Sequence, residues 1–223
     1  FRVVNQFSLQ GRHRVRRPDV VCFLNGLPIA LLELKNPTDE HTDIWDAYNQ
    51  LQTYKEDIPD LFVYNEALVI SDGFLARIGS LTANQERFQP WPTVSDEDDK
   101  PYIDWQLEVL VRGFFDPARL LEYLRYFILF DNNDGQLIKK MAGYHQFHAV
   151  REAVQATLIA SQAPPALPGV EERRAPYRQR VEPGSRKAGV VWHTQGSGKR
   201  ISMCCYAGML LQQPDMQNPT LLV

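Results

Sequence analysis

The chain has 223 residues, which is enough for one complete domain and part of another. Its formal net charge is −3 and 44% of its residues are hydrophobic, so the composition carries no overall basic excess for nucleic acid. Its 3 cysteines form neither a disulfide framework nor a zinc-binding pattern. The sequence opens without a secretory leader pattern, and its apolar runs are too short to cross a bilayer. We expect a cytoplasmic protein with reduced thiols, which excludes the secreted and membrane classes.

The first informative segment, residues 17–35, reads as two apolar strands joined by an Asn-Gly turn of the hairpin type. The first strand carries Asp19, and the second carries Glu33 and Lys35. Because side chains alternate along a strand, Glu33 and Lys35 project from the same face. A carboxylate in an otherwise apolar strand requires a strong partner, which favours a metal site over a solvated face of the hairpin.

Paired carboxylates from Asp19 and Glu33 would form an oxygen-rich site of the kind that suits Mg²⁺. Such an ion orients and acidifies a water molecule and shields the charge that grows on a phosphate. Lys35 would either help to deprotonate that water or stabilise the phosphate, and the sequence leaves both roles open. The competing interpretation is that Glu33 and Lys35 are a cross-strand pair on a solvated surface.

A helix is predicted next, from about residue 39 to residue 55, with Thr38 or Asp39 as its N-cap. On this helix Gln50 and Tyr54 stand at i and i+4, which places an amide and a phenol on one face. They can support the metal site or touch a DNA phosphate. The alternative is that Tyr54 packs in the core while Gln50 is exposed.

Further elements follow from the residue pattern. We expect a strand, a glycine turn and another strand over residues 69–79, a strand over 106–111, helices over 116–130 and 136–160, and a proline-rich surface loop over 161–187. Two charged runs flank these elements. The basic residues Arg12, His13, Arg14, Arg16 and Arg17 either lead phosphate toward Asp19 or form a solvated face, and the acidic run 96–99 reads as a surface loop.

A second motif begins at residue 189, where a short apolar strand runs into a glycine-rich loop and then into a helix over 201–211. This is the order of elements that a phosphate-binding loop requires. Backbone N–H groups of the loop surround phosphate oxygens, and Lys199 reaches toward the β and γ phosphates. The predicted nucleotide-binding residues here are Thr194, Gly196, Ser197, Gly198, Lys199 and Arg200.

The loop departs from the general G-x-x-x-x-G-K-[ST] pattern at two positions. His193 stands where the first glycine is usual. Arg200 stands where Ser or Thr would ligate Mg²⁺, and a guanidinium has no lone pair to offer a metal. We therefore expect impaired use of Mg²⁺-ATP by a chain that carries Arg200, with restoration of Ser or Thr as the test.

These motifs resemble a known family. Arg-Pro-Asp at residues 17–19, Glu-Leu-Lys at 33–35 and Gln-x-x-x-Tyr at 50–54 resemble the PD-(D/E)xK nuclease domain in the R subunit of type I restriction-modification enzymes, and the resemblance continues over nearly the whole chain. It implies that the catalytic residues are Asp19, Glu33, Lys35, Gln50 and Tyr54, with Asp19 and Glu33 as Mg²⁺ ligands. The family's upstream acidic ligand is expected outside the given chain.

The segment around Gln146 resembles the glutamine motif that reads adenine in superfamily two helicases, and its amide could both accept from and donate to the base. The alternative is a polar helix N-terminus held by packing. The resemblance implies an ATP cofactor, ATP-driven DNA translocation, a double-stranded DNA substrate, and methylation and specificity subunits as partners. Because no Walker B acid follows the loop, this chain, read as an N-terminal fragment, should not hydrolyse ATP appreciably.

We therefore expect an α/β protein in three parts: a PD-(D/E)xK endonuclease domain at 1–112, a connecting helical segment at 113–140, and the start of a RecA-like helicase domain at 141–223. The expected function is Mg²⁺-dependent DNA cleavage within a type I restriction enzyme. Two alternatives remain: a non-catalytic DNA-binding or subunit-docking module, and a nucleotide-binding switch that rests on the phosphate loop alone. Metal binding separates the nuclease from the docking module.

Overall fold

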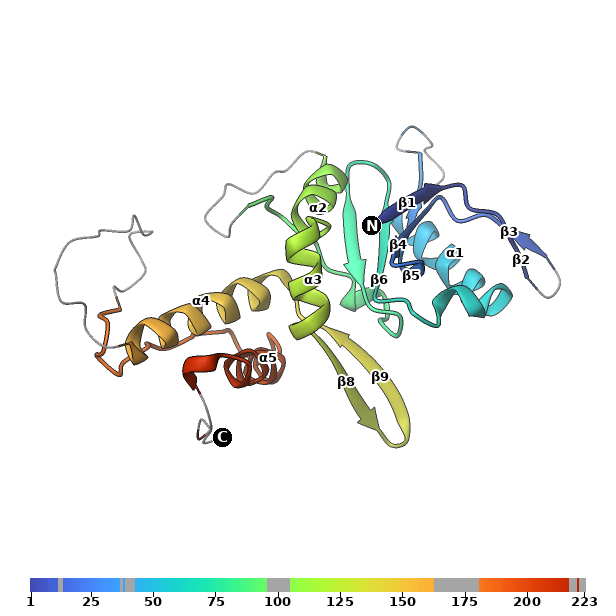
Figure 1. The fold of residues 1–223 in the computed structure, drawn as a ribbon. Coiled ribbons are helices and arrows are strands. Elements are labelled where there is room, and N and C mark those ends of the chain that lie inside the picture. The colour runs from blue at the N-terminus through green and yellow to red at the C-terminus, as the bar shows by residue number, and fades with distance from the viewer. Residues whose placement is uncertain are drawn as a thin grey trace. The chain divides into compact units, whose positions relative to one another are not determined.

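The computed structural model describes residues 1–11, 14–36, 38, 43–95, 105–162, 181–216 and 220. The chain separates into two compact units, Phe1–Tyr144 and His145–Val223. The first unit is a mixed α/β structure built around a five-stranded sheet (Figure 1). The segment 113–140, expected as a connector, lies within this first unit. No helix among the described residues is long and apolar enough to span a membrane.

The main sheet has the strand order β1-β4-β5-β6-β7. Its strands are β1 (Arg2–Asn5), β4 (Val20–Leu24), β5 (Leu27–Leu34), β6 (Ala67–Ser71) and β7 (Ala76–Gly79). Strands β5 and β6 are parallel and the other neighbours are antiparallel, so the sheet is mixed. The predicted hairpin is confirmed as β4–β5. Its turn residues Asn25 and Gly26 have φ values of 51° and 85°, as the tight hairpin turn requires.

Helix α1 (Ile44–Asp57) covers one face of this sheet. Its buried positions, Ile44, Ala47, Leu51 and Tyr54, recur every three or four residues, as expected for one helix face. They pack against sheet residues that include Val21, Leu31, Leu68 and Ile70. The face of β5 that carries Leu31 also carries Glu33, because side chains two apart on a strand share a face. The core therefore fixes which side of the sheet Glu33 occupies.

The predicted start of this helix is wrong. The N-cap is Asp43, whose carboxylate accepts hydrogen bonds from the Trp45 and Asp46 amides, while the Asp46 side chain accepts one from the Asp43 amide. This reciprocal pair satisfies N–H groups at both positions, which a lone cap does not. Thr38 bonds to Asn36 instead. Residue 39 lies outside the described part of the chain.

Two later predictions in this unit are also wrong. Residues 106–111, predicted as a strand, belong to helix α2 (Gln106–Phe114), where Val109, Leu110, Gly113 and Phe114 are buried at helical spacing. The predicted helix over 136–160 is helical only in its later part, since residues 136–141 form a strand. Strands β8 (Ile128–Asn133) and β9 (Gln136–Met141) form a hairpin before α4 begins, and α3 (Pro117–Tyr126) accordingly ends before residue 130.

The remaining elements of the first unit are short. Strands β2 (Leu9–Gln10) and β3 (Val15–Arg16) pair as a ribbon, and 3-10 turns span Pro59–Phe62 and Gln85–Arg87. Within the ribbon, Arg16 forms an ion pair of 2.5 Å with Asp57 at the end of α1. Arg14 and Arg17 are exposed, whereas residues 12 and 13 of the predicted basic cluster lie outside the described residues. Arg16 therefore has a structural partner in Asp57, whereas Arg14 and Arg17 remain exposed.

The second unit contains α4 (Tyr144–Ser161), which begins at the boundary, α5 (Lys199–Leu211) and a 3-10 turn at Pro214–Met216. Helix α5 confirms the predicted helix after the glycine-rich loop. The predicted strand over 189–192 is not formed, and Val190 and Trp192 are 90% and 87% exposed. A strand needs a neighbour to pair its backbone groups, and the described residues of this unit include no other strand.

Candidate functional site

The acidic residues predicted from the hairpin lie in one row across the sheet. Val20 pairs with Leu32 between β4 and β5, so the continuing register sets Asp19 opposite Glu33. Opposed residues in an antiparallel pair share a face of the sheet. The structure therefore brings the two carboxylates together on the face that α1 covers.

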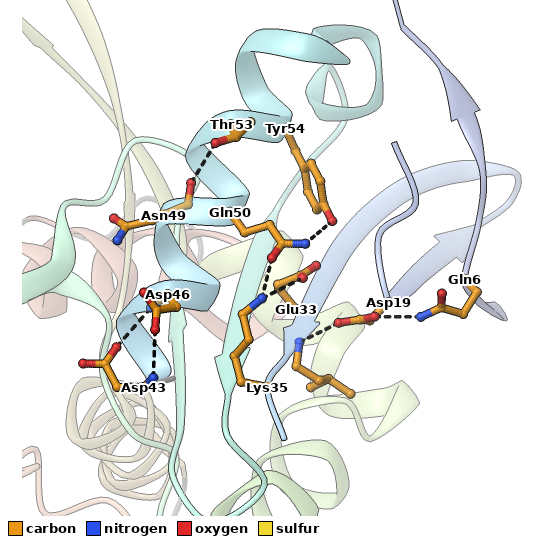
Figure 2. Close-up of polar contacts among 11 residues, drawn as sticks. Gln6, Asp19, Glu33, Lys35, Asp43, Asp46, Asn49, Gln50, Thr53 and Tyr54 are labelled. Carbon is orange, nitrogen blue, oxygen red and sulfur yellow. Dashed lines mark hydrogen bonds and ion pairs between the residues drawn. The ribbon is translucent and has the colours of Figure 1, made fainter. Parts of the chain in front are cut away.

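Hydrogen bonds fix the Asp19 side chain at the end of β5 (Figure 2). Its Oδ2 atom accepts a hydrogen bond of 2.9 Å from the Leu34 amide, and its Oδ1 atom accepts one of 2.7 Å from the Gln6 side chain. The contact with Gln6, at the end of β1, was not predicted, because only the β1–β4 pairing brings the two residues together. Asp19 is thereby held in one orientation beside Glu33.

Glu33 is almost completely buried, with 2% of its surface exposed. Its Oε2 atom has no hydrogen-bond partner among the described residues. The pKa of Glu33 is raised from 4.5 to about 7, mainly by burial and also by the nearby charge of Asp19, while Lys35 partly offsets the rise. A buried carboxylate with an unpaired oxygen is costly unless a cation joins it. A cation at Oε2, in addition to the Lys35 ammonium near Oε1, would therefore stabilise the Glu33 carboxylate.

Lys35, Gln50 and Tyr54 form a chain of hydrogen bonds next to Glu33 (Figure 2). The Lys35 ammonium donates to the Gln50 side-chain oxygen, and the Gln50 nitrogen donates to the Tyr54 hydroxyl at 2.5 Å. The same ammonium lies 3.5 Å from Glu33 Oε1. Tyr54 is 3% exposed, and burial is the main cause that raises its pKa. Gln50 and Tyr54 of α1 thus meet Lys35 and Glu33, and the Gln50 side chain bonds to Lys35 rather than facing solvent.

The donors at this position fit a magnesium ion. The described residues include no group of three or more His, Cys, Asp or Glu side chains that could hold a metal. Mg²⁺, however, usually takes only one or two protein carboxylates and keeps several waters. Asp19 and Glu33 supply such a pair, and the unpaired Glu33 oxygen is an available ligand atom. Cys22, three positions after Asp19 and paired with Ala30, lies on the opposite face of the sheet from Asp19 and Glu33, and burial raises its pKa to about 11.

The second predicted site lies in the second unit, at the N-terminus of α5. Gly196 and Gly198 have φ values of 83° and 79°, in the left-handed region that glycine adopts readily. The Thr194 carbonyl accepts hydrogen bonds from the Ser197 amide at 3.3 Å and hydroxyl at 2.8 Å. The loop therefore turns its chain directly before Lys199, where the free N–H groups of a helix start favour an anion.

Gln146 braces this loop. Its side-chain nitrogen donates to the carbonyls of Ser197 and Gly198 at 2.7 and 3.0 Å, and only 4% of the residue is exposed. A methyl group on Gly198 would lie 2.5 Å from that nitrogen, so a side chain there would push the Gln146 amide off the loop carbonyls, and the left-handed φ also favours glycine. The sequence predicted an adenine contact for Gln146. The structure shows that its donor end is engaged by the phosphate loop.

Two histidines meet beside the loop. The rings of His145 and His193 lie 5.7 Å apart, and His145 Nε2 is 3.4 Å from the Ser197 carbonyl. Burial lowers the pKa of His193, and the charges of His145 and Lys199 lower it further. Lys199 and Arg200 are both exposed. The position where a magnesium-ligating hydroxyl is usual therefore presents a second cation beside Lys199.

The fold and these two sites define a chain with paired acids on a mixed sheet followed by an ATPase-type phosphate loop. Residues 1–87 match the family described as Type I restriction enzyme R protein N terminus, and residues 145–223 match SWI2/SNF2 ATPase. The chain belongs to the type I restriction enzyme R protein family, as its motifs predicted.

Curated relatives match the chain along its whole length. It is 46% identical to the type I restriction enzyme HindI endonuclease subunit of Haemophilus influenzae and 34% identical to the putative type I restriction enzyme MjaIXP endonuclease subunit of Methanocaldococcus jannaschii. It is 27% identical to the SauCOLORF180P endonuclease subunit of Staphylococcus aureus. The chain spans 20%, 21% and 21% of these three relatives, so it corresponds to about a fifth of their length.

Proposed function

We propose that the first unit is a PD-(D/E)xK nuclease that hydrolyses DNA phosphodiester bonds with Mg²⁺. The observation that carries this proposal is the buried, unpaired Glu33 oxygen beside Asp19, with the Lys35 ammonium 3.5 Å from the same carboxylate. A structural ion pair would satisfy both Glu33 oxygens within the protein. An unsatisfied acid next to a second acid is instead an arrangement that a cation stabilises.

Each residue of the site has a separate role in this proposal. Asp19 and Glu33 hold the ion, which when bound supplies an acidified water and neutralises charge on the phosphate. Lys35 stabilises the phosphate charge or positions the water, and only 18% of its side chain is exposed. Gln50 and Tyr54 keep that ammonium next to Glu33 through their hydrogen bonds.

We also propose that the second unit binds ATP phosphates as part of an ATP-dependent DNA-translocating subunit. The supporting features are the two left-handed glycines, the free start of α5 and the match to SWI2/SNF2 ATPase. The proposed contacts are made by Thr194, Gly196, Ser197, Gly198, Lys199 and Arg200, with Gln146 behind the loop.

The relatives' names describe endonuclease subunits of type I restriction enzymes. We accordingly propose double-stranded DNA as the substrate, and methylation and specificity subunits as the partners that supply target recognition. In this assignment the chain cuts without sequence preference of its own. Cleavage would follow ATP-driven translocation in the complete enzyme.

The test is DNA cleavage by the full-length subunit assembled with its partners. Glu33→Gln should abolish cleavage of a plasmid that carries the recognition site while ATP-driven translocation continues. The matched control is Glu108→Gln, which changes an exposed acid whose ion pair with Arg112 lies on the surface of α2. Equal cleavage by the Glu33→Gln enzyme and the wild type would reject the nuclease assignment.

A further inference from the structure

Two aromatic side chains stand exposed and in contact on the first unit. Phe74 is 51% exposed and Trp105 is 60% exposed, and their ring centroids lie 5.5 Å apart with an interplanar angle of 34°. Single exposed apolar residues are common on protein surfaces. A pair of large rings that contact each other and still face solvent is different, because the fold leaves their apolar faces unburied.

The backbone around this pair is fixed. The Asp72 side chain accepts hydrogen bonds from the amides of Phe74 and Leu75 at 3.0 and 2.7 Å. The Phe74 carbonyl accepts one of 3.0 Å from the Gln106 amide. Trp105 has a φ of 59°, a left-handed conformation that is rare for a bulky residue and persists only where its surroundings impose it. These hydrogen bonds shape the turn that carries Phe74 and tie it to the residue that follows Trp105.

The turn that carries Phe74 lies at the same end of the sheet as the acidic pair. Ser71, the last residue of β6, pairs with Leu34, and its carbonyl accepts a hydrogen bond of 2.7 Å from the Lys35 amide. Phe74 follows in the next turn. A strand held at the Asp19–Glu33 pair would therefore continue toward the aromatic rings.

Arg77 is related to both features, by strand register to Glu33 and by a hydrogen bond to the residue after Trp105. Glu33 pairs with Ile70, and Ile70 pairs with Arg77, so Arg77 shares a row and a sheet face with Glu33 at a distance of two strands. Two strand spacings are roughly 10 Å. The Arg77 guanidinium donates a hydrogen bond of 2.7 Å to the Gln106 side chain, the residue that follows Trp105. The Arg77 guanidinium therefore stands on the same sheet face as Glu33 and is bonded to the residue next to Trp105.

We propose that Phe74, Trp105 and Arg77 form a nucleotide subsite, in which the rings stack on a base left unpaired where the double-stranded substrate opens, and Arg77 contacts a phosphate of the same strand. This inference rests on the proposed nuclease function. Aromatic rings bind the faces of all four bases, and a guanidinium binds phosphate.

The test measures binding without cleavage. A fluorescent single-stranded oligonucleotide of mixed sequence is titrated with this chain in EDTA, and anisotropy gives the dissociation constant. Phe74→Ala and Trp105→Ala should each weaken binding about tenfold, since stacking on one aromatic ring commonly contributes that much. Trp105→Phe should restore most of the affinity. The matched control is Phe130→Ala, which removes a ring that is 61% exposed on the β8–β9 hairpin.

The charge of Arg77 is tested by the salt dependence of the same binding. Arg77→Gln should lower the slope of log affinity against log salt by about 0.7, the value for one phosphate contact on a single strand, whereas Arg77→Lys should keep it. Unchanged affinity in both aromatic variants, an equal loss in Phe130→Ala, or no binding by the wild type would overturn the subsite.

The two proposals can fail separately. The oligonucleotide titration contains no metal, and Trp105→Ala leaves Asp19 and Glu33 in place, so its Mn²⁺ titration should match that of the wild type. Loss of DNA affinity in the aromatic variants without metal binding at Glu33 would reject the nuclease and keep the subsite. Metal binding at Glu33 with unaltered DNA affinity in those variants would keep the nuclease proposal and reject the subsite.

Discussion

The two candidate sites differ in how their residues are brought together. In the first unit, side chains from β5 and α1 and from the residues that flank β1, β4 and β5 meet through hydrogen bonds and a buried ion pair. In the second unit, nearly all the residues come from one short loop, and Gln146 on α4 is the side chain that braces it. The first site is made by tertiary packing and the second by local backbone geometry. Mutations should therefore disturb them in different ways.

The largest effect is expected when Lys35, the lysine of the first site, is replaced. Lys35→Met in the assembled enzyme should lower the rate of DNA cleavage by a factor of about 100 to 1,000, because under the proposed function it removes the charge that acts at the reacting phosphate. Metal binding by Asp19 and Glu33 should remain. The control is Lys140→Met, an exposed lysine paired with Asp131 on the hairpin. Plasmid cleavage kinetics measure the effect, and a rate equal to that of the wild type would contradict it.

A stability effect of up to about 3 kcal/mol is expected at Glu33 in metal-free buffer. Folding raises the pKa of Glu33 from 4.5 to about 7, so its contribution to stability is present below pH 4.5 and is lost as the pH rises through 7. Glu33→Gln should therefore raise the free energy of unfolding at pH 8 and change it little at pH 4.

Urea unfolding of the two proteins in EDTA checks this pH dependence. Addition of Mg²⁺ at pH 8 should stabilise the wild type and leave Glu33→Gln unchanged. A Glu33→Gln protein that is less stable than the wild type at pH 8 without metal would show that the Glu33 carboxylate is satisfied within the fold.

The second site should respond to a backbone change. Gly198→Ala forces a left-handed alanine, at about 1–2 kcal/mol, and pushes its methyl group against the Gln146 nitrogen. ATP should then bind at least about tenfold more weakly, as measured by the shift in melting temperature with ATP concentration. The control is Gly208→Ala, since no atom lies within 4 Å of a methyl group at that helical position. Equal losses in both variants would contradict the assignment.

The smallest effect is expected at the helix cap that supports the first site. Asp43→Ala should cost about 1 kcal/mol, because two amides at the start of α1 lose their acceptor. Thr38→Ala is the control, since Thr38 bonds only locally to Asn36. Thermal unfolding compares the two. A larger loss of stability in Thr38→Ala than in Asp43→Ala would indicate that Thr38 caps the helix, as the sequence predicted.

Local patterns predicted much of the fold. The Asn25-Gly26 turn with its flanking apolar runs is a two-residue signal, and it gave the β4–β5 hairpin correctly. The equivalent Asp134-Gly135 turn, with φ values of 51° and 85°, was missed because the residues after it were read as a helix. Residues 106–111 show why short apolar runs mislead: they suit a strand or a buried helix, and packing decides.

The candidate site was predictable only in part. Alternation along β5 places Glu33 and Lys35 on one face, and helical spacing places Gln50 with Tyr54. The meeting of the strand pair with the helix pair depends on how α1 packs on the sheet, which no local pattern contains. The same holds for Gln6 beside Asp19. For Gln146 the pattern named a role in nucleotide binding, but its contact with Ser197 and Gly198 depends on the loop lying against α4.

The measurement that tests the central claim most directly is a calorimetric titration of Mn²⁺ into this chain and into Glu33→Gln. The account predicts that one ion binds the wild type and that binding is lost in the variant, because Glu33 supplies the unpaired buried oxygen. Glu108→Gln should titrate as the wild type does. Identical binding by the wild type and Glu33→Gln, or no binding by the wild type, would contradict a metal site formed by Asp19 and Glu33.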